Sequence, residues 1–408
     1  MVLQLGVLAA AAYIYAVAEL APIGAMPSIA VDLHVSQSRV GMLTAAYALI
    51  SVLTTVPMVR WTARWPRRRV LVLTLVSLTA SQLLSALAPG LVLLAASRVL
   101  CALTHGLMWS IIAPIGARLV PASHTARATT AVYVGTSAAL IIGNPLTASM
   151  SQAWGWRPAV LVVAVVAGVV TVLARWCLPV LNTDSVAGQK NSLHIGIGDT
   201  RLLTLCVITL IGVTAHFASY TFVVPIVGQI TGADGRGQAV LLAAYGAVGL
   251  VSMTVLARSA DRRPRTSISV TLAVLCSAFV VLASTASGGA AVPGTAAILI
   301  WGGCAAVLPP MLQAAVIKAC PQYAERASAW YVTAFQIGIV AGSVGGGAVY
   351  GNHGVLPVVA MSAVLFAVTL AAFVSATRRV RVECPARPRW PADPVCRWVS
   401  PPAVPGRR

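Results

Sequence analysis

Apolar runs long enough to cross a lipid bilayer follow one another along this chain with little between them. A membrane-spanning helix needs about 20 apolar residues. Hydrophobic residues make up 58% of the chain and charged residues only 9%, whereas soluble domains carry about 25% charged residues. The sequence therefore predicts an all-α polytopic membrane protein with twelve transmembrane helices. The predicted spans are residues 5–27, 39–60, 69–88, 91–117, 127–150, 157–180, 201–224, 238–258, 266–286, 293–318, 326–349 and 354–376.

The basic residues favour one orientation in the membrane. The net charge of +19 does not indicate nucleic-acid binding, because the arginines are spread over short links between apolar runs. The links after even-numbered runs are basic, whereas the opposite side carries only Arg39, Arg157 and Arg236. An excess of Lys and Arg marks the cytoplasmic side of a membrane protein. We expect both termini in the cytoplasm, the lipid bilayer around the chain, and no nucleic-acid partner.

The two halves of the chain repeat each other. Three short matches, beginning at Ala45, Ala63 and Arg127, recur after 198, 198 and 199 residues, each at the same place within six runs. We therefore predict a six-helix half at 1–180, a cytoplasmic linker at 181–200, a second half at 201–376 and a disordered, basic, Pro-rich tail at 377–408. In transporters with two such halves, the substrate binds near the midplane between them.

Four ionisable residues lie well inside apolar runs, away from their ends, where a charge is costly and usually faces a cavity or a partner. Arg98 and His105 are seven residues apart, which places them on one helix face. At 1.5 Å per residue, Glu19 and Arg98 lie at similar depths, roughly 10 Å from the outer surface of a ~30 Å core. We expect them to share a cavity, with His105 deeper and His216 near the depth of Glu19.

These residues suit proton transfer. Burial favours the neutral form of the Glu19 carboxyl and a nearby arginine favours the ionised form, so a conformational change can load and unload a proton. The alternative is a static buried pair that holds helices together. For His105, beside Gly106, the alternative to proton transfer is a structural hydrogen bond to a neighbouring carbonyl.

Other candidates are backbone features and loop charges. Gly135 and Gly143 share a face that allows close helix approach, and Pro145, after Asn144, removes a hydrogen bond. Pro309 and Pro310 make a similar break before Gln313, whose amide is a candidate substrate contact. The links after runs 2 and 8 carry related charged motifs, with Arg64 and Arg68 in the first and Asp261 and Arg262 in the second.

Motifs for nucleotide or metal chemistry are missing from the sequence. It contains no GxxxxGK[ST] loop, no HExxH site and no GxSxG elbow. The cysteines inside apolar runs behave as small hydrophobes, and those of the tail lack zinc-ligand spacing. We expect no metal, no cofactor, no enzymatic activity, and transport driven by a gradient.

Several stretches resemble one family. The chain resembles the drug:proton antiporters of the major facilitator superfamily, in the branch of sugar-efflux (arabinose-efflux-like) permeases and actinobacterial chloramphenicol-resistance exporters. The family's loop motif after helix 2 usually reads Gly then Asp-Arg, but here Val59 and Ala63-Arg64 stand there, whereas Asp261-Arg262 keeps the pattern. The antiporter motif usually lacks the intervening Asn144. The matching stretches are Glu19 to Gly24, Met26 to Ala30, Arg98 to Gly106, Arg118 to Pro121, Gly143 to Leu146, Gly155 to Arg157 and Phe217 to Pro225.

The resemblance implies a monomeric transporter of the bacterial inner membrane that exports a small organic solute, drug-like or sugar-like, in exchange for protons. One alternative is a proton symporter that performs uptake with the same fold. A polytopic membrane enzyme is a second alternative, which the duplicated halves disfavour. A transporter-like sensor is a third.

Overall fold

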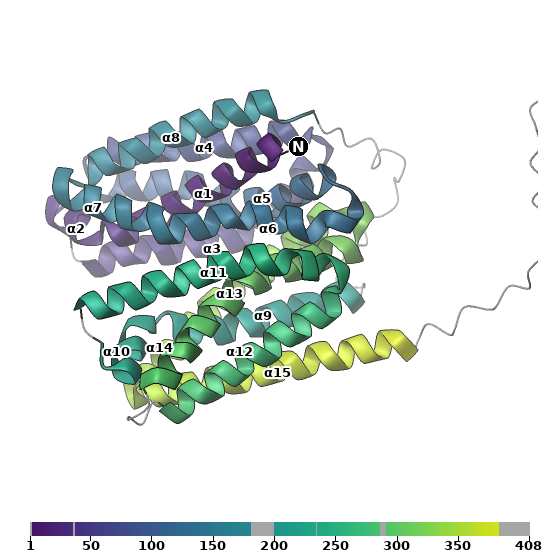
Figure 1. Ribbon diagram of the computed structural model, residues 1–408. Coiled ribbons are helices and arrows are strands. Elements are labelled where there is room, and N and C mark those ends of the chain that lie inside the picture. Colours follow the sequence, from purple (N-terminus) through teal and green to yellow (C-terminus); the bar gives the residue numbers. More distant parts are fainter. Residues whose placement is uncertain (1, 36, 181–199, 234, 286–290, 383–408) are drawn as a thin grey trace, which may run out of the picture.

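The computed structural model describes residues 2–35, 37–180, 200–233, 235–285 and 291–382 (Figure 1). The side chains of Asn144 and Pro145, nearly all of the predicted linker and the tail beyond Val382 lie outside the described residues. The described parts of the chain are helical and contain no strand.

The helices fall into two groups, which occupy the upper and lower parts of Figure 1. The first group precedes residue 180 and the second follows residue 199. The first contains α1 (Val2–Gly24), α2 (Met26–Asp32), α3 (Gln37–Trp61), α4 (Arg67–Ala86), α5 (Leu91–Arg118), α6 (Thr125–Ala138), α7 (Asn144–Trp154) and α8 (Trp156–Cys177). The second contains α9 (Thr200–Tyr220), α10 (Val223–Thr231), α11 (Gly235–Arg262), α12 (Pro264–Thr285), α13 (Ala291–Ala319), α14 (Ala324–His353) and α15 (Val355–Val382).

Each predicted span overlaps one of these helices or a broken pair of them. The first span breaks between α1 and α2, after Pro22, and the seventh between α9 and α10. In the fifth, a π turn at Ala139–Gly143 separates α6 from α7 and ends two residues before Pro145, which has no N–H to donate. The last helix runs to Val382, past the predicted end of its span at 376, because arginine is a good helix former and the membrane boundary does not end a helix.

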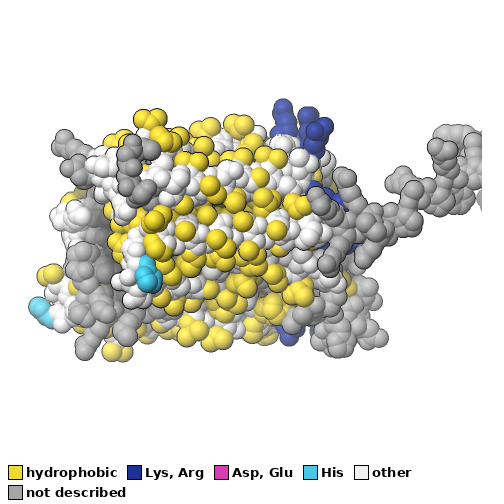
Figure 2. All heavy atoms as spheres, turned by 90° about the horizontal axis from the view of Figure 1, so that it is seen from below, with side chains coloured by type: hydrophobic (Ala, Val, Ile, Leu, Met, Phe, Trp, Pro, Cys, Tyr) yellow, Lys and Arg dark blue, Asp and Glu magenta, His cyan; other side chains and the backbone are white. Residues whose placement is uncertain are grey.

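The surface and the hydropathy agree on a membrane protein. Ten described helices are long and apolar enough to cross a bilayer. The broken fifth span and α3 are the two predicted spans outside that set. Figure 2 shows hydrophobic side chains over the middle of one face and Lys and Arg side chains at one end. We call that end, which carries Arg64, Arg68, Arg118, Arg175 and Arg262, the arginine-rich end.

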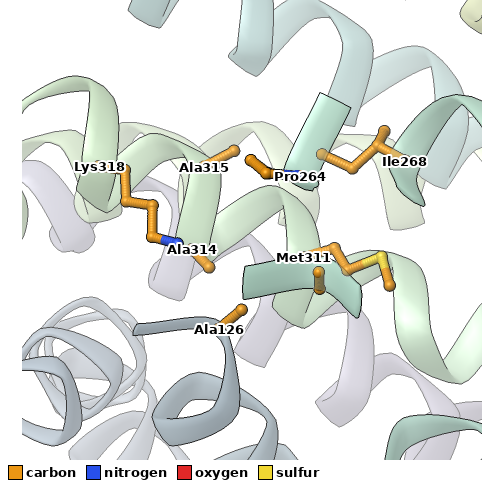
Figure 3. Close-up of a pocket in the computed structure, with 8 residues that line it drawn as sticks. Ala126, Pro264, Ile268, Met311, Ala314, Ala315 and Lys318 are labelled. Carbon is orange, nitrogen blue, oxygen red and sulfur yellow. The ribbon is translucent and has the colours of Figure 1, made fainter. Parts of the chain in front are cut away.

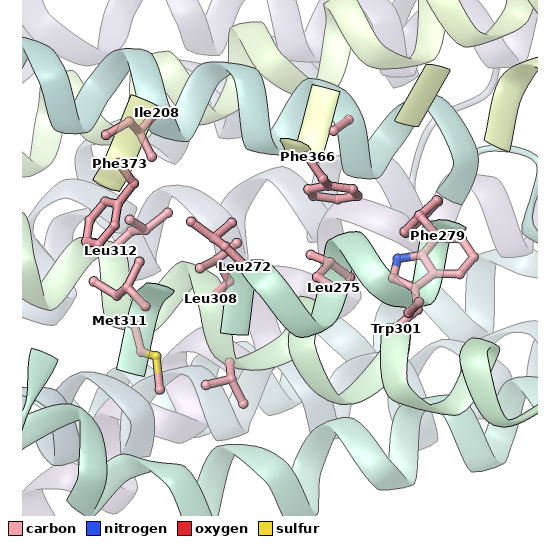
Figure 4. Packing of buried hydrophobic residues seen from close by; sticks show 14 of the residues in the cluster. Ile208, Leu272, Leu275, Phe279, Trp301, Leu308, Met311, Leu312, Phe366 and Phe373 are labelled. Carbon is pink, nitrogen blue, oxygen red and sulfur yellow. The ribbon is translucent and has the colours of Figure 1, made fainter. Parts of the chain in front are cut away.

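Each group has its own apolar core. In the second, Trp301 lies between α9, α11 and α12, with its ring centroid 5.0 Å from that of Phe279, and Phe279 lies 5.0 Å from Phe366 (Figure 4). In the first, Tyr15 is fully buried and donates a hydrogen bond to the Thr74 carbonyl at 2.7 Å. The buried Tyr15 hydroxyl is therefore satisfied by a carbonyl within its own core.

Glycines bring two helix pairs into close contact, one pair in each group. A Cβ at Gly135 would overlap the Ala9 carbonyl oxygen, and one at Gly143 would overlap the Val17 side chain. In the second group, a Cβ at Gly342 would lie 2.5 Å from the Thr214 carbonyl oxygen. Small residues of this kind allow membrane helices to approach closely. Helices α1 and α6, and likewise α9 and α14, therefore pack backbone to backbone.

We predict that Gly135→Ala destabilises the protein, because the new methyl group must push α6 away from the backbone of α1. Overpacking of this kind typically costs about 1–3 kcal/mol. Thermal unfolding of the purified protein measures the loss. The control is Gly345→Ala, since a Cβ at Gly345 has no neighbour within 4 Å. Equal unfolding temperatures for the two variants would contradict the proposed close contact.

Candidate functional site

Arg98 ties α5 to α1 through backbone carbonyls. Its Nη1 donates to the Ala18 carbonyl at 2.8 Å and its Nη2 donates to the Glu19 carbonyl at 3.0 Å. Pro22 explains why one acceptor is available, because proline has no N–H for the carbonyl four residues earlier, which is that of Ala18. An orphaned carbonyl in a membrane helix must find another donor. The buried guanidinium of Arg98 supplies it.

Tyr47 of α3 links Arg98 to His105. The guanidinium of Arg98 lies over the Tyr47 ring, with Cζ 4.7 Å from the centroid, a favourable cation–π geometry. The Tyr47 hydroxyl is 2.7 Å from His105 Nδ1. Arg98 and His105 thus contact one tyrosine from positions two turns apart on the same face of α5.

His105 lies between the carboxylate of Glu19 and the second helix group. Its Nε2 is 3.8 Å from Glu19 Oε1 and 3.4 Å from Nε2 of Gln336 in α14. The His105 side chain is 2% exposed, whereas that of Glu19 is 27% exposed. The structure therefore pairs the Glu19 carboxylate with His105. The ion pairs of the described residues do not include one between Glu19 and Arg98, because Arg98 is engaged by the α1 carbonyls.

The partly exposed Glu19 carboxylate can take up a proton, and the resulting change in its charge acts on the buried His105 ring. A neutral imidazole offers one donor and one acceptor, whereas an imidazolium offers two donors. Tyr47, Glu19 and Gln336 contact the two ring nitrogens, so a proton gained or lost changes which of these contacts is satisfied. One of them, Gln336, belongs to the other helix group.

His216 lies in a separate aromatic cluster of the second group. Trp301 Nε1 donates to His216 Nδ1 at 3.0 Å, and the His216 ring is stacked on Tyr220 with centroids 5.0 Å apart. Tyr245 completes the cluster, with its ring centroid 5.4 Å from that of Trp301. The structure thus places His216 apart from the network of Glu19, Arg98 and His105.

Gln313 forms a structural bridge in this conformation. It is fully buried, and its Nε2 donates to Ser328 Oγ at 2.7 Å and to the Trp109 carbonyl at 3.3 Å. Ser328 belongs to α14 and Trp109 to α5, so the amide connects the two helix groups. A substrate contact for Gln313, expected from the sequence, requires the groups to separate.

Asp261 clamps the two groups together at the arginine-rich end. Its carboxylate, 1% exposed, accepts the backbone N–H groups of Ala126 at 2.7 Å and Arg127 at 3.2 Å. The Arg127 guanidinium and Lys318 Nζ lie 3.2 and 3.4 Å from the same carboxylate. The first N–H groups of a helix have no partner within it and favour an anion. Asp261, at the end of α11, thus caps α6 of the other group.

Glu325, also in the second group, forms a second clamp to the first group at the same end. In the first turn of α14, its carboxylate pairs with Arg67 and lies 3.2 Å from Arg118 Nη2. Arg67 also donates to the carbonyls of Thr62 and Ala63 at 2.9 and 2.8 Å. Ala63 stands where the family usually has an aspartate, so in this chain the acid sits on α14 and the loop supplies a carbonyl.

The remaining loop residues of the predicted motifs lie around these clamps. Arg68 Nη1 donates to the Leu178 carbonyl at 3.2 Å, which ties α4 to the end of α8. Arg64 and Arg262 are exposed at the same end. Figure 3 shows a small cavity beside Lys318, lined by Ala126, Pro264 and Met311. Its volume of about 10 Å³ leaves room for at most one water. Packing at this junction is therefore tight.

At the opposite end, Asp32 binds within a single group. It accepts a hydrogen bond from Trp156 Nε1 at 3.1 Å and pairs with Arg157, which also donates to the Ala88 carbonyl at 2.8 Å. Burial raises the pKa of Asp32, but the hydrogen bonds from Trp156 and Arg157 and the charge of Arg157 outweigh burial and hold that pKa below its ordinary value. Asp32 therefore fixes α2 to α8 without joining the two groups.

Sequence reasoning did not select Tyr47, Gln336 or Glu325 as site residues. Tyr47 lies in the repeated Ala-Ala-Tyr stretch, which was used only as a sign of duplication. Gln336 is a polar residue inside an apolar run, and Glu325 is one of nine acidic residues in the chain. A polar residue inside an apolar run was the available signal for Gln336, and the scarcity of acidic residues was the signal for Glu325.

Comparison with known proteins agrees with this architecture. The family model described as "Major Facilitator Superfamily" matches residues 8–343. The "Chloramphenicol efflux pump Rv0191" of Mycobacterium tuberculosis (strain ATCC 25618 / H37Rv) is 48% identical over 356 residues, covering 85% of this chain and 86% of the pump.

Two solved structures share the fold at low identity. The human organic anion transporter MFSD10 has a TM-score of 0.73 at 15% identity, with 91% of this chain and 98% of that chain covered. A variant of the E. coli fucose:proton symporter FucP has a TM-score of 0.71 at 14% identity, with the same coverage.

The two helix groups, clamped across their junction and carrying a buried ionisable network, define a polytopic secondary transporter. The chain belongs to the Major Facilitator Superfamily, and its substrate is a small molecule. The family resemblance and the all-helical fold expected from the sequence are confirmed.

We predict that the cost of removing Arg98 depends on Pro22. Arg98→Met leaves the Ala18 carbonyl without a donor, but in a Pro22→Ala background residue 22 regains an N–H that can bond to it. The double-mutant cycle should show a coupling energy of about 1 kcal/mol. The measurement is unfolding in mixed micelles. Pro57→Ala, in α3, is the matched control and should be additive with Arg98→Met. Equal costs in all backgrounds would contradict the assigned role of Pro22.

We predict that Asp261→Ala exposes the first turn of α6, because the N–H groups of Ala126 and Arg127 lose a charged acceptor. Hydrogen bonds to charged groups contribute about 1.5–3 kcal/mol. Amide hydrogen exchange in a peptide containing these residues should therefore accelerate by roughly tenfold or more. Asp32→Ala is the control, since its partners lie at the opposite end. Unchanged exchange in Asp261→Ala would show that the cap contributes no protection.

Proposed function

We propose that this protein is a proton-coupled exporter of chloramphenicol or a related amphipathic antibiotic, working by alternating access. The observation that carries the proposal is the Glu19–His105 pair, 3.8 Å apart, with one member partly accessible and the other buried. The 48% identical chloramphenicol efflux pump supports the direction of transport and the substrate class.

The network supports coupling because it reaches across the junction of the two groups. Loading a proton on Glu19 weakens its attraction to His105, and His105 then redistributes its hydrogen bonds between Tyr47 and Gln336. Gln336 is held by α14, the helix that also carries Glu325 at the arginine-rich end. Protonation thus acts on a helix that must move for the groups to rock about the site.

The clamps support alternating access because each is a polar contact that water can replace. Asp261 and Glu325 each bind residues of the opposite group. Opening this end exchanges these contacts for water, which is available at the membrane surface. We infer that the arginine-rich end is cytoplasmic, that the protein lies in the bacterial inner membrane as a monomer with both termini inside, and that the structure represents the conformation closed to the cytoplasm.

The predicted division of the chain into two halves fits alternating access. We propose that residues 1–180 and 201–376 are the two moving halves. The antiporter-type stretch with Gly135 and Gly143 supports this proposal, since both glycines lie against α1, which carries Glu19. Close contact there transmits displacement of α1 to the broken helix α6–α7.

We predict that cells expressing the wild type accumulate less labelled chloramphenicol than cells without the protein, and that a protonophore abolishes the difference. Glu19→Gln should raise accumulation to the level of cells without the protein, because the glutamine cannot carry a proton. Asp32→Asn is the matched carboxylate control and should export like the wild type. Immunoblots of membranes establish equal protein levels.

Each other outcome would change the proposal. Export that survives Glu19→Gln would move the proton site to His105 or His216. Higher accumulation in wild-type cells would reverse the direction to uptake. No effect on chloramphenicol, in cells that contain the folded protein, would overturn the proposed substrate.

A further inference from the structure

A basic groove lies on the outside of the first helix group, away from the Glu19–His105 network. It is formed where α4 begins and α8 ends, and its volume is about 380 Å³, within the range of small-ligand sites. Its charged lining comes from Arg68, Arg69 and Arg175. Its apolar lining comes from Val72, Leu73 and Val180.

The charges of the groove have no acidic partner in the described part of the chain. The acidic side chains described at this end are Asp261 and Glu325, and both are bound at the junction of the two groups. Arg68 is held at the rim by its hydrogen bond to the Leu178 carbonyl. Arg69 lies over the Trp65 ring, with Cζ 5.5 Å from the centroid. The Leu178 carbonyl and the Trp65 ring thus position Arg68 and Arg69, and neither neighbour carries a negative charge.

The groove lies at the level where membrane meets water. Trp61 is 67% exposed and Trp176 is 81% exposed, and tryptophans of this kind gather at the headgroup level. The arginines occupy the first turn of α4 and the last turn of α8. Leu73 and Val180 are exposed on the apolar side of the same groove. A ligand that fits must carry an anionic group attached to an apolar chain.

We propose that this groove binds an anionic phospholipid such as phosphatidylglycerol. The headgroup phosphate contacts Arg69 and Arg175, with Arg68 beside them, and an acyl chain lies along Val72 and Leu73. Basic pockets between membrane helices are suited to acidic lipid headgroups, and arginine matches phosphate geometry with paired donors. The bound lipid bridges α4 and α8 beside Arg67, the residue that pairs with Glu325.

The test measures binding of fluorescent phosphatidylglycerol to the purified full chain in nonionic detergent micelles. R69Q/R175Q removes two groove charges and should weaken half-saturation by roughly 25-fold, at about 1 kcal/mol or fivefold per arginine. R69K/R175K keeps the charges and should retain most of the affinity. The matched control R263Q/R265Q removes the same charge from exposed positions at the start of α12 and should bind like the wild type. Equal thermal unfolding of all variants establishes that each is folded.

Two further arms separate the lipid from other ligands. Fluorescent phosphatidylcholine, with no net charge, should bind at least roughly tenfold more weakly than phosphatidylglycerol if the arginines recognise net charge. Inorganic phosphate, added as a competitor, should fail to displace the lipid because it lacks the acyl chains. Equal binding of both lipids, displacement by inorganic phosphate, or equal losses in R69Q/R175Q and R263Q/R265Q would each overturn the proposal. All of these readouts are independent of transport, so they stand or fall apart from the proposed export.

Discussion

The hydrogen bonds from Arg98 to the backbone of α1 organise the first helix group. A membrane core offers no water to a carbonyl that loses its helical donor, so the carbonyl freed by Pro22 must be satisfied from another helix. Arg98 does this while its charge rests on the face of Tyr47. The position of Arg98 in turn sets the face of α5 that presents His105 to Glu19. One proline thus determines where the ionisable network forms.

The two helix groups meet through polar contacts at different levels. Around His105, Gln336 and Gln313 of the second group contact α5 of the first. At the arginine-rich end, Asp261 and Glu325 each bind the opposite group through ion pairs, and Asp261 also through backbone N–H groups. These polar contacts can open because water can replace each partner once the groups separate, whereas the apolar contacts between the groups, such as Ala113 with Ile317 and Ala324, lose burial at a cost proportional to their area.

The clamps also show how this chain forms an ion pair where its loop has Ala63 in place of an acid. One half keeps the loop acid at Asp261, and the other has Ala63 at the matching place. There Arg67 donates a hydrogen bond to the Ala63 carbonyl and pairs with Glu325 of α14, in the opposite helix group. The requirement is an ion pair across the junction. Either partner can carry the acid, because the attraction depends on the separation of the charges and not on which helix carries which sign.

The sequence by itself determined the all-helical membrane fold class and the order of the apolar runs, because apolar length and polar links are local properties that the bilayer enforces. It also identified Glu19, Arg98 and His105 as unusual, because a charge in an apolar run is costly wherever the helix lies. Only the tertiary structure decided their partners. Depth along each helix placed Glu19 level with Arg98, yet the rotation of α1 directs the carboxylate to His105 and leaves Arg98 to the carbonyls. That rotation is set by contacts such as Gly135 against Ala9, which join helices distant in sequence and therefore leave no local pattern to read.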